Sequence, residues 1–257
     1  MHVIVLALLQ GIVEFLPISS SGHLILVPAL LGWPDQGLSF DIAVHFGTLA
    51  AVVVYFRRDL PRLIVAAFNA RDPEFKFAWA IALASVPVGL AGLLLGDLVA
   101  GALRSPIVIA AATAGFGVLL WLADRYQRGQ RREQELLLGQ ALLIGFAQAL
   151  ALIPGTSRSG ITMTAGLALG LSRAAAARFS FLLSVPAIGM AASWEAYQLA
   201  AAPEPVAWGV LAIAALLSGA TAFAAIAAFL RLIERIGMWS FAVYRVLLAG
   251  VIVYVLY

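Results

Sequence analysis

Two short polar sequences interrupt apolar stretches of this chain, and they hold residue types that phosphate and metal chemistry require. They are QGIVEFLPISSSGH, residues 10–23, and QALALIPGTSRSGIT, residues 148–162. The first copy alone carries a carboxylate and an imidazole, and the second alone carries a guanidinium. Ionisable residues inside apolar sequence are costly, so each one predicts a functional site. A shift of 138 residues aligns Gln10 with Gln148, Ser19 with Ser157, Ser21 with Ser159, and Gly22 with Gly160.

The first copy combines a candidate metal pair with candidate catalytic groups. Gln10 and Glu14 are four residues apart, so they share one face of a helix. We expect Pro17 to end that helix, because a residue before proline avoids the α region. The next helix then begins at the serines, where free backbone N–H groups favour an anion. Glu14, Ser20 and His23 are candidates for metal binding, base catalysis or nucleophilic attack, and Ser19, Ser21 and Gly22 for phosphate binding.

The second copy has the residues of a phosphate cradle. Pro154 and Gly155 are expected to break a helix, and Arg158 can grip a phosphate with two parallel hydrogen bonds. Between the two copies we expect a divalent cation, Mg²⁺ or Ca²⁺, because oxygen ligands such as those of Gln10 and Glu14 suit these ions. The further phosphate-binding candidates are Thr156, Ser157, Ser159, Gly160 and Thr162.

The composition is that of a polytopic membrane protein. Apolar residues make up 63% of the chain and charged residues 11%, against about 45–50% and about 25% in soluble domains. The net charge is only +3, and the arginines lie at segment ends, so nucleic-acid binding gains no support. The absence of cysteine excludes disulfides and thiolate metal sites.

Six apolar segments are long enough to cross a bilayer, which takes about 20 residues. Two further apolar stretches, 1–31 and 136–172, are each broken near the middle by a proline, serines and glycines. The six predicted spans are 38–57, 77–96, 105–123, 178–200, 206–230 and 238–257.

The distribution of bases orients the chain. A single threading brings 13 of the 16 bases to one side, which the positive-inside rule makes cytoplasmic, with both termini outside. Both ends of 136–172 then carry cytoplasmic arginines, so this stretch must be a re-entrant helix–loop–helix hairpin, and 1–31 its counterpart from outside. We therefore predict an all-α membrane protein in which a hairpin and three spans occur twice with inverted topology. Repeat one is 1–123, repeat two is 136–257, and 124–135 is a cytoplasmic linker.

The two motifs resemble those of a known family. QGIVEFLPISSSGH is similar to the E/Q-x-x-x-E segment and the following serine–histidine stretch of the undecaprenyl-diphosphate phosphatases, the bacitracin-resistance type of membrane phosphatase. PGTSRSG is similar to the second signature of that family, and length and hydropathy agree over all 257 residues. Either motif alone is less specific than the pair.

The resemblance implies a function, a location and roles for residues. The function is hydrolysis of undecaprenyl diphosphate to the monophosphate and phosphate, which recycles the lipid carrier of the cell wall, in the bacterial inner membrane with a site open to the periplasmic side. Gln10 and Glu14 match the metal-linked pair of the family. At the first position of the pair this chain has glutamine, whose neutral amide oxygen is a weaker metal ligand than a carboxylate. Ser20 and His23 match the catalytic serine and histidine of the family. Arg158 matches its phosphate-binding arginine, and Ser157, Ser159 and Thr162 lie beside it.

Other interpretations remain open at this stage. A transporter or lipid flippase would also suit an inverted repeat with a central anion site, and a flippase activity does not exclude a phosphatase. The nucleophile is serine, histidine or water, and a homodimer is possible. His45 could line the cavity, although packing is the favoured role, and Arg245 is expected to reach the headgroups or to form a structural ion pair.

Overall fold

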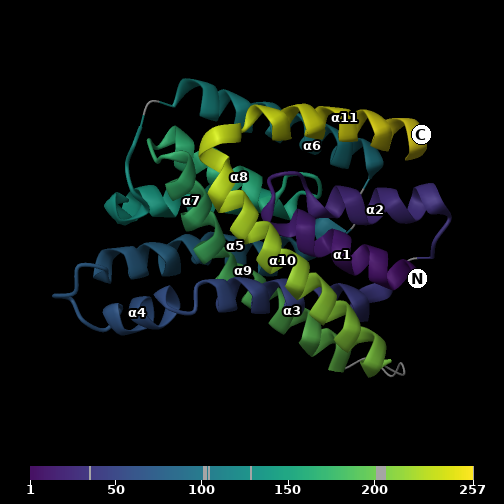
Figure 1. Ribbon diagram of the computed structural model, residues 1–257, viewed down its shortest axis with the longest axis horizontal. Coiled ribbons are helices and arrows are strands. Elements are labelled where there is room, and N and C mark those ends of the chain that lie inside the picture. Colours follow the sequence, from purple (N-terminus) through teal and green to yellow (C-terminus); the bar gives the residue numbers. More distant parts are fainter. Residues whose placement is uncertain (35, 101–102, 104, 128, 201–206, 257) are drawn as a thin grey trace.

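The computed structural model describes residues 1–257 apart from 35, 101–102, 104, 128, 201–206 and 257. Within these residues the chain forms eleven α-helices, two short 3-10 helices and no strand, which confirms the all-α class (Figure 1). Arg128, one of the 13 bases that orient the chain, lies outside the described residues, as do Arg104 and the terminal positions 206 and 257 of two predicted spans.

Six of the described helices are long and apolar enough to cross a membrane, and they coincide with the six predicted spans. The clearest differences are at the ends of two helices. α9 begins at Arg173 rather than at 178, and α10 continues past Arg231 and Arg235, because hydropathy marks where apolar sequence ends and not where the helix ends. The six are α3 (Gly37–Tyr55), α5 (Phe75–Ala100), α6 (Pro106–Tyr126), α9 (Arg173–Ala200), α10 (Trp208–Ile236) and α11 (Trp239–Leu256).

The two broken stretches each form a pair of short helices. The first consists of α1 (His2–Phe15) and α2 (Ser20–Leu31), which lie side by side in Figure 1. The second consists of α7 (Leu138–Ala149) with the 3-10 helix η3 (Leu150–Leu152), followed by α8 (Arg158–Ala168). We refer to residues 16–22 as the first tip and to residues 153–160 as the second tip.

A proline ends the helix at each tip, as the sequence predicts. Leu16, before Pro17, has φ −73° and ψ 144°, and Ile153, before Pro154, has φ −72° and ψ 114°. Both residues are extended because the proline ring clashes with an α conformation in the preceding residue.

The helices that leave the two tips begin with the same unusual geometry. Ser19 has φ 70° and Ser157 has φ 68°, and these are the only positive values among the described residues other than glycine. The Ser19 hydroxyl accepts a hydrogen bond from the Gly22 N–H at 3.3 Å, and the Ser157 hydroxyl accepts one from Gly160 at 3.2 Å. A non-glycine residue rarely adopts this conformation, so the surroundings of each tip must enforce it.

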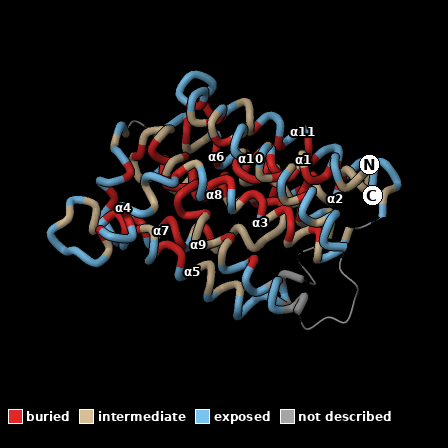
Figure 2. The backbone as a smooth tube through the Cα atoms, turned by 60° about the horizontal axis from the view of Figure 1, so that its bottom comes forward, coloured by how far each residue is buried: buried red, intermediate tan, exposed pale blue. Residues whose placement is uncertain are grey.

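Small residues bring the broken helices close to the long ones. α1 packs chiefly on α10, and α7 on α5. A methyl group added at Gly11 would lie 2.3 Å from the Ser218 carbonyl oxygen, and one added at Gly145 would lie 2.5 Å from that of Ala84. Such contacts let backbones approach where lipid supplies no hydrophobic drive for helix association. The largest group of buried apolar residues surrounds α9 and includes residues of α3, α5, α7, α8 and α10 (Figure 2).

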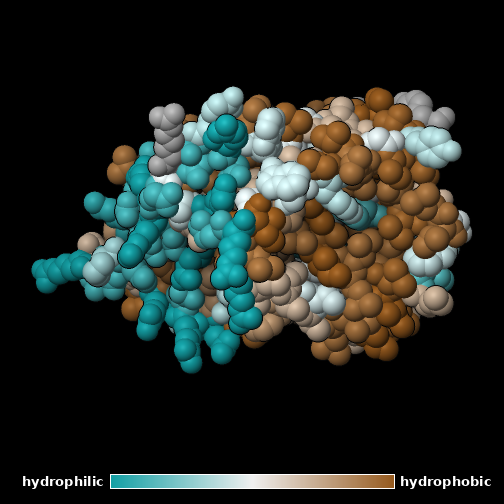
Figure 3. All heavy atoms as spheres, turned by 45° about the horizontal axis from the view of Figure 1, so that its top comes forward, coloured by the Kyte–Doolittle hydropathy of each residue, from teal (hydrophilic) through white to brown (hydrophobic). Residues whose placement is uncertain are grey.

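Polar side chains gather at one end of the molecule, and apolar side chains cover most of the rest of the visible face (Figure 3). The polar end contains α4 (Asp59–Ala66) and the 3-10 helix η2 (Glu133–Glu135), neither of which hydropathy predicted. Arg173 is bound to Asp124 at 2.6 Å, and Arg178 pairs with Asp59 and Glu133. The two arginines at the start of α9 therefore tie the ends of α4, α6 and η2 together.

Candidate active site

The carboxylate of Glu14 is the centre of the site. One of its oxygens accepts hydrogen bonds from the Gln10 amide at 3.1 Å and from the Ser20 hydroxyl at 3.0 Å. The other oxygen is 3.2 Å from Nη2 of Arg158. Nε2 of His45, on α3, is 4.0 Å from the first oxygen. Three groups from both sequence motifs thus converge on one buried acid.

The Arg158 guanidinium is held in place by its surroundings. It lies over the ring of Phe15 at 5.7 Å, and its Nη1 donates to the Ser180 carbonyl at 3.2 Å. The Thr162 hydroxyl bonds the Arg158 carbonyl at 2.8 Å and the Ser180 hydroxyl at 2.7 Å. Thr162 and Ser180 therefore brace the start of α8, and the hydroxyl of Thr162 is already engaged in the protein.

Serines join the two tips directly. The Ser21 hydroxyl accepts a hydrogen bond from the Gly155 N–H at 3.1 Å. The Ser159 hydroxyl donates to the Leu16 carbonyl at 3.0 Å. Each tip thus supplies one hydroxyl to the backbone of the other, and this exchange brings Glu14 and Arg158 into contact although 144 residues separate them.

Most of the predicted phosphate-binding residues have structural bonds of their own. The Gly22 and Gly160 N–H groups are bonded to the capping hydroxyls of Ser19 and Ser157, and those hydroxyls also pair with Ser21 and Ser159 at 3.3 and 3.2 Å. Thr156 differs, because its hydroxyl is buried without a hydrogen-bond partner. The groups that face Glu14 itself, Ser20 and Arg158, are the ones best placed to meet an anion.

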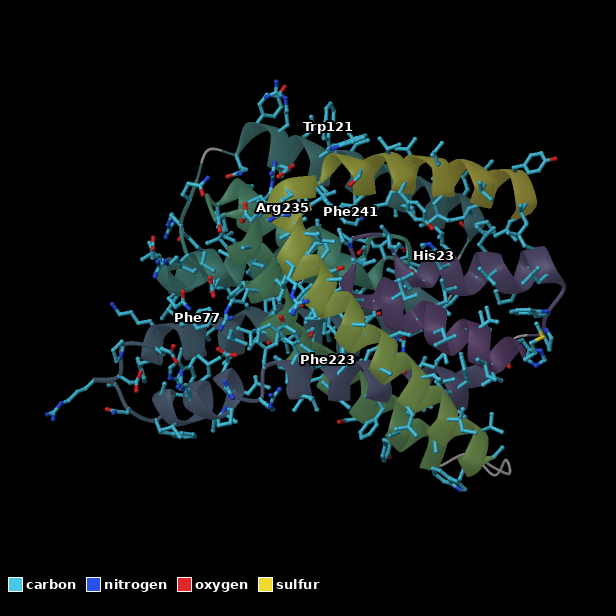
Figure 4. The ribbon with its side chains drawn as sticks, viewed as in Figure 1. His23, Phe77, Trp121, Phe223, Arg235 and Phe241 are labelled. Atoms are coloured by element: carbon cyan, nitrogen blue, oxygen red, sulfur yellow. The ribbon has the colours of Figure 1, made fainter. Side chains whose placement is uncertain are left out.

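His23 lies on α2 (Figure 4), and its ring is bonded to Tyr244 on α11. Its Nδ1 is 2.7 Å from the Ser19 carbonyl oxygen, and its Nε2 is 2.6 Å from the Tyr244 hydroxyl. The two rings stack with an interplanar angle of 6°. A carbonyl only accepts, so Nδ1 carries the proton and Nε2 accepts from Tyr244. The partner of the Ser20 hydroxyl is therefore Glu14.

The residues around Glu14 fit a divalent cation only in part. The side-chain oxygen of Gln10 is buried without a hydrogen-bond partner, which suits a ligand atom. The described part of the chain holds no group of three His, Cys, Asp or Glu side chains arranged for a metal. Mg²⁺ is nevertheless often bound through one or two carboxylates together with substrate phosphates. Gln10 and Glu14 thus fit a cation whose remaining ligands come from a phosphate ligand and water.

Sequence reasoning missed several neighbours of the site. Nothing in the sequence around Ser180 or Tyr244 indicates that they belong to the site. A packing role was favoured for His45, but its ring lies beside Glu14. The expectation for Arg245 was wrong in both forms. Its side chain is completely buried, and it binds backbone carbonyls, with no carboxylate within ion-pair distance in the part of the chain that is described. The feature of the sequence that could have indicated a buried role for Arg245 is its position as a single arginine deep in an apolar span.

The chain is similar to proteins of known family over nearly its whole length. The family model described as "Bacitracin resistance protein BacA" matches residues 3–251. An "Undecaprenyl-diphosphatase" of Nitrosococcus oceani is 53% identical, covering 98% of this chain and 97% of the relative. One of Teredinibacter turnerae is 50% identical over 99% and 98% of the two chains. An "Undecaprenyl-diphosphatase 2" of Stutzerimonas stutzeri is 51% identical over 98% and 96%.

The geometry of the Glu14–Arg158 pair predicts a specific pattern of stability. Arg158→Met leaves a buried carboxylate without its cation, and removing one partner of a buried ion pair costs about 3–5 kcal/mol. We expect a clear fall in the unfolding temperature of the purified protein in detergent, largely reversed in the double variant Glu14→Gln/Arg158→Met. Arg62→Met, which removes an exposed arginine, is the control. A double variant as unstable as the single one would contradict the pairing.

Proposed function

This chain belongs to the family described as bacitracin resistance protein BacA, and we propose how its two tips perform the reaction of an undecaprenyl-diphosphatase. The enzyme hydrolyses undecaprenyl diphosphate to undecaprenyl phosphate and inorganic phosphate, which recycles the lipid carrier of the cell wall. Its relatives have phosphatase names, and a transporter would have no need of a hydroxyl bonded to a carboxylate. The phosphatase is therefore favoured over the transporter alternative.

The observation that carries the proposed mechanism is the bond of 3.0 Å between the Ser20 hydroxyl and Glu14. Glu14 takes the Ser20 proton while the hydroxyl oxygen attacks the terminal phosphorus of the substrate. The bond between that phosphorus and the bridging oxygen breaks, and undecaprenyl phosphate leaves. The protonated Glu14 gives its proton to the departing phosphate, which restores the carboxylate. Water then attacks the phosphoserine. Glu14 takes a proton from this water and returns it to the serine oxygen as the bond between that oxygen and phosphorus breaks, and phosphate is released.

Arg158 has the complementary role on the phosphate. Phosphoryl transfer spreads negative charge over the oxygens of the transferred group, and a guanidinium in fixed geometry stabilises that charge. The bonds from Arg158 to the Ser180 carbonyl and to Glu14, both at 3.2 Å, hold it in one orientation before substrate arrives. His23, whose two nitrogens are engaged, orients the start of α2 and through it Ser20.

Gln10 and Glu14 would hold a divalent cation, Mg²⁺ or Ca²⁺, together with oxygens of the diphosphate. A cation bound there would neutralise part of the charge of the substrate and polarise its phosphate oxygens. The unpartnered Gln10 oxygen supports this assignment. Ser20, Arg158 and the backbone of the tips do the remaining work of binding and orienting the phosphate.

The two broken stretches are proposed to be re-entrant hairpins of an inverted repeat. Three observations support this: each half of the chain has one broken stretch and three long helices, the tips share their capping geometry, and the packing partners correspond. α1 lies on α10 as α7 lies on α5, and α6 pairs with α11. Irregular backbone at membrane depth requires protein around it, which the contacts between the tips provide.

The polar end of the molecule is proposed to face the cytoplasm of the bacterial inner membrane. Its exposed bases include Arg57, Arg62 and Arg71, in agreement with the positive-inside rule. The first tip then belongs to a hairpin that enters from outside, so the diphosphate reaches Ser20 from the periplasmic side while the prenyl chain stays in lipid.

The proposed nucleophile predicts an order among the serine variants. Ser20→Ala should reduce phosphate release from C15 and C55 prenyl diphosphates by several orders of magnitude, because it removes the attacking oxygen. Ser19→Ala and Ser21→Ala, which remove a cap and a bond between the tips, should lose less. If Ser20→Ala retains most of its turnover while His23→Ala is inactive in a folded protein, histidine or water is the nucleophile instead.

The metal assignment predicts opposite effects of two single-atom changes. Glu14→Gln should abolish the rise in unfolding temperature that divalent cations cause, because it removes the charged ligand. Gln10→Glu should tighten Mg²⁺ or Ca²⁺ binding, measured as the rise in unfolding temperature on adding the ion, because two adjacent carboxylates require a cation. Wild-type activity that is insensitive to EDTA, or a Gln10→Glu protein that shows no such rise, would remove this pair from the metal site.

The proposed orientation can be tested by labelling, because the chain has no cysteine. Cysteines at Arg71 and Gln130, both exposed at the polar end, should be protected from an impermeant thiol reagent added to intact cells. A cysteine at Leu31, which is the last residue of α2 and is 54% exposed, should react. All three cysteines should react after the cells are permeabilised. Labelling at position 71 or 130 in intact cells would show that the polar end faces outward and would contradict the proposed orientation.

A further inference from the structure

One arginine outside both motifs makes contact with both tips. Arg245 lies in the middle of α11 and is completely buried. Its Nη2 donates to the carbonyls of Gly155 at 2.9 Å and Thr156 at 2.8 Å, and its Nη1 lies 3.5 Å from the Pro17 carbonyl oxygen. The same side chain bonds α6 through Nε and the Thr113 carbonyl at 2.8 Å.

These carbonyls need a donor because the helices break at the tips. Pro17, Gly155 and Thr156 lie where the α-helical ladder is interrupted, and a carbonyl buried in an apolar region without a donor costs free energy. A guanidinium carries five N–H groups in a rigid plane, so one side chain can satisfy several carbonyls at once. No ammonium can reach all of them from one point.

Two glycines leave space for the side chain of Arg245. A methyl group at Gly117, on α6, would lie 2.9 Å from Cβ of Arg245, and one at Gly160, on α8, would lie 2.7 Å from its Nη1. Alanine at either position would therefore displace the arginine. The niche is built from three elements that are far apart in the sequence.

The contacts of Arg245 bracket the reacting groups of the proposed mechanism. Thr156 and Gly160 lie two residues before and two residues after Arg158, and Pro17 lies three residues before Ser20. A guanidinium that fixes both segments also fixes how Arg158 and Ser20 face Glu14. We propose that Arg245 is a positioning residue of the phosphatase, and this proposal rests on the proposed function. Arg245 would hold the two tips in register through their carbonyl groups.

The proposal predicts an effect on turnover rather than on substrate affinity. A small misplacement of reacting groups can reduce the rate by about a hundredfold. In purified protein well below its unfolding temperature, Arg245→Lys should lower kcat by about tenfold or more with KM within about threefold. Arg245→Met should lower kcat further. Wild-type kcat in both folded variants would overturn the proposal.

A glycine pair gives a matched test that leaves every polar group in place. Gly117→Ala pushes against the stem of Arg245 and should lower kcat, whereas Gly115→Ala, on the same helix with no atom within 4 Å of the added carbon, should resemble the wild type. This test remains informative if the Arg245 variants fail to fold. Equal activity of the two alanine variants would contradict the proposed role.

The separation of the tips can be measured without any assay of activity. Spin labels on cysteines at Ile12 and Leu150, which are 44% and 43% exposed, report on α1 and η3 beside the two tips. Arg245→Met and Gly117→Ala should broaden or shift the distance distribution, and Gly115→Ala should not. An unchanged distribution in a variant of low kcat would overturn the positioning role. A wild-type protein that releases no phosphate would instead refute the proposed function, with the distance test unaffected.

Discussion

The constraint on which this structure depends is that broken helices buried in apolar surroundings must find partners for the backbone groups they release. Apolar side chains and lipid offer these groups no hydrogen-bond partner, so protein groups must satisfy those that do not face the site. Ser19 and Ser157 bind the free N–H groups at the start of α2 and α8, and Arg245 binds carbonyls at both breaks. The polar residues that satisfy this constraint are the same residues that hold the reacting groups in place.

Hydropathy and local chemistry predict much of this fold because they depend on neighbouring residues. The six long helices follow from apolar runs, and the breaks at Leu16 and Ile153 follow from the prolines after them. Glu14 and Arg158 were identified because charge is costly in such sequence. The helix α4 was missed because its 8 residues are too few to register as a membrane span.

The remaining features of the site could not be predicted because they depend on pairs of residues far apart in the chain. Nothing near His23 indicates that Tyr244, 221 residues away, binds its Nε2. Likewise, the sequence around Ser159 does not reveal that its hydroxyl meets the Leu16 carbonyl. The serines at the tips therefore read as a row of equivalent phosphate ligands, whereas the fold divides them between capping, joining the tips and contact with Glu14.

The long sequence separation of Glu14 and Arg158 has a consequence for the biosynthesis of the protein. α1 and α2 have 14 and 12 residues, fewer than the about 20 that span a bilayer. The carboxylate of Glu14, at the end of α1, leaves the ribosome 144 residues ahead of the guanidinium that neutralises it. The contact between Glu14 and Arg158 can therefore form only after α8 has been made, so the segment that is translated first completes its contacts after α3, α5, α6 and α7 have also been made.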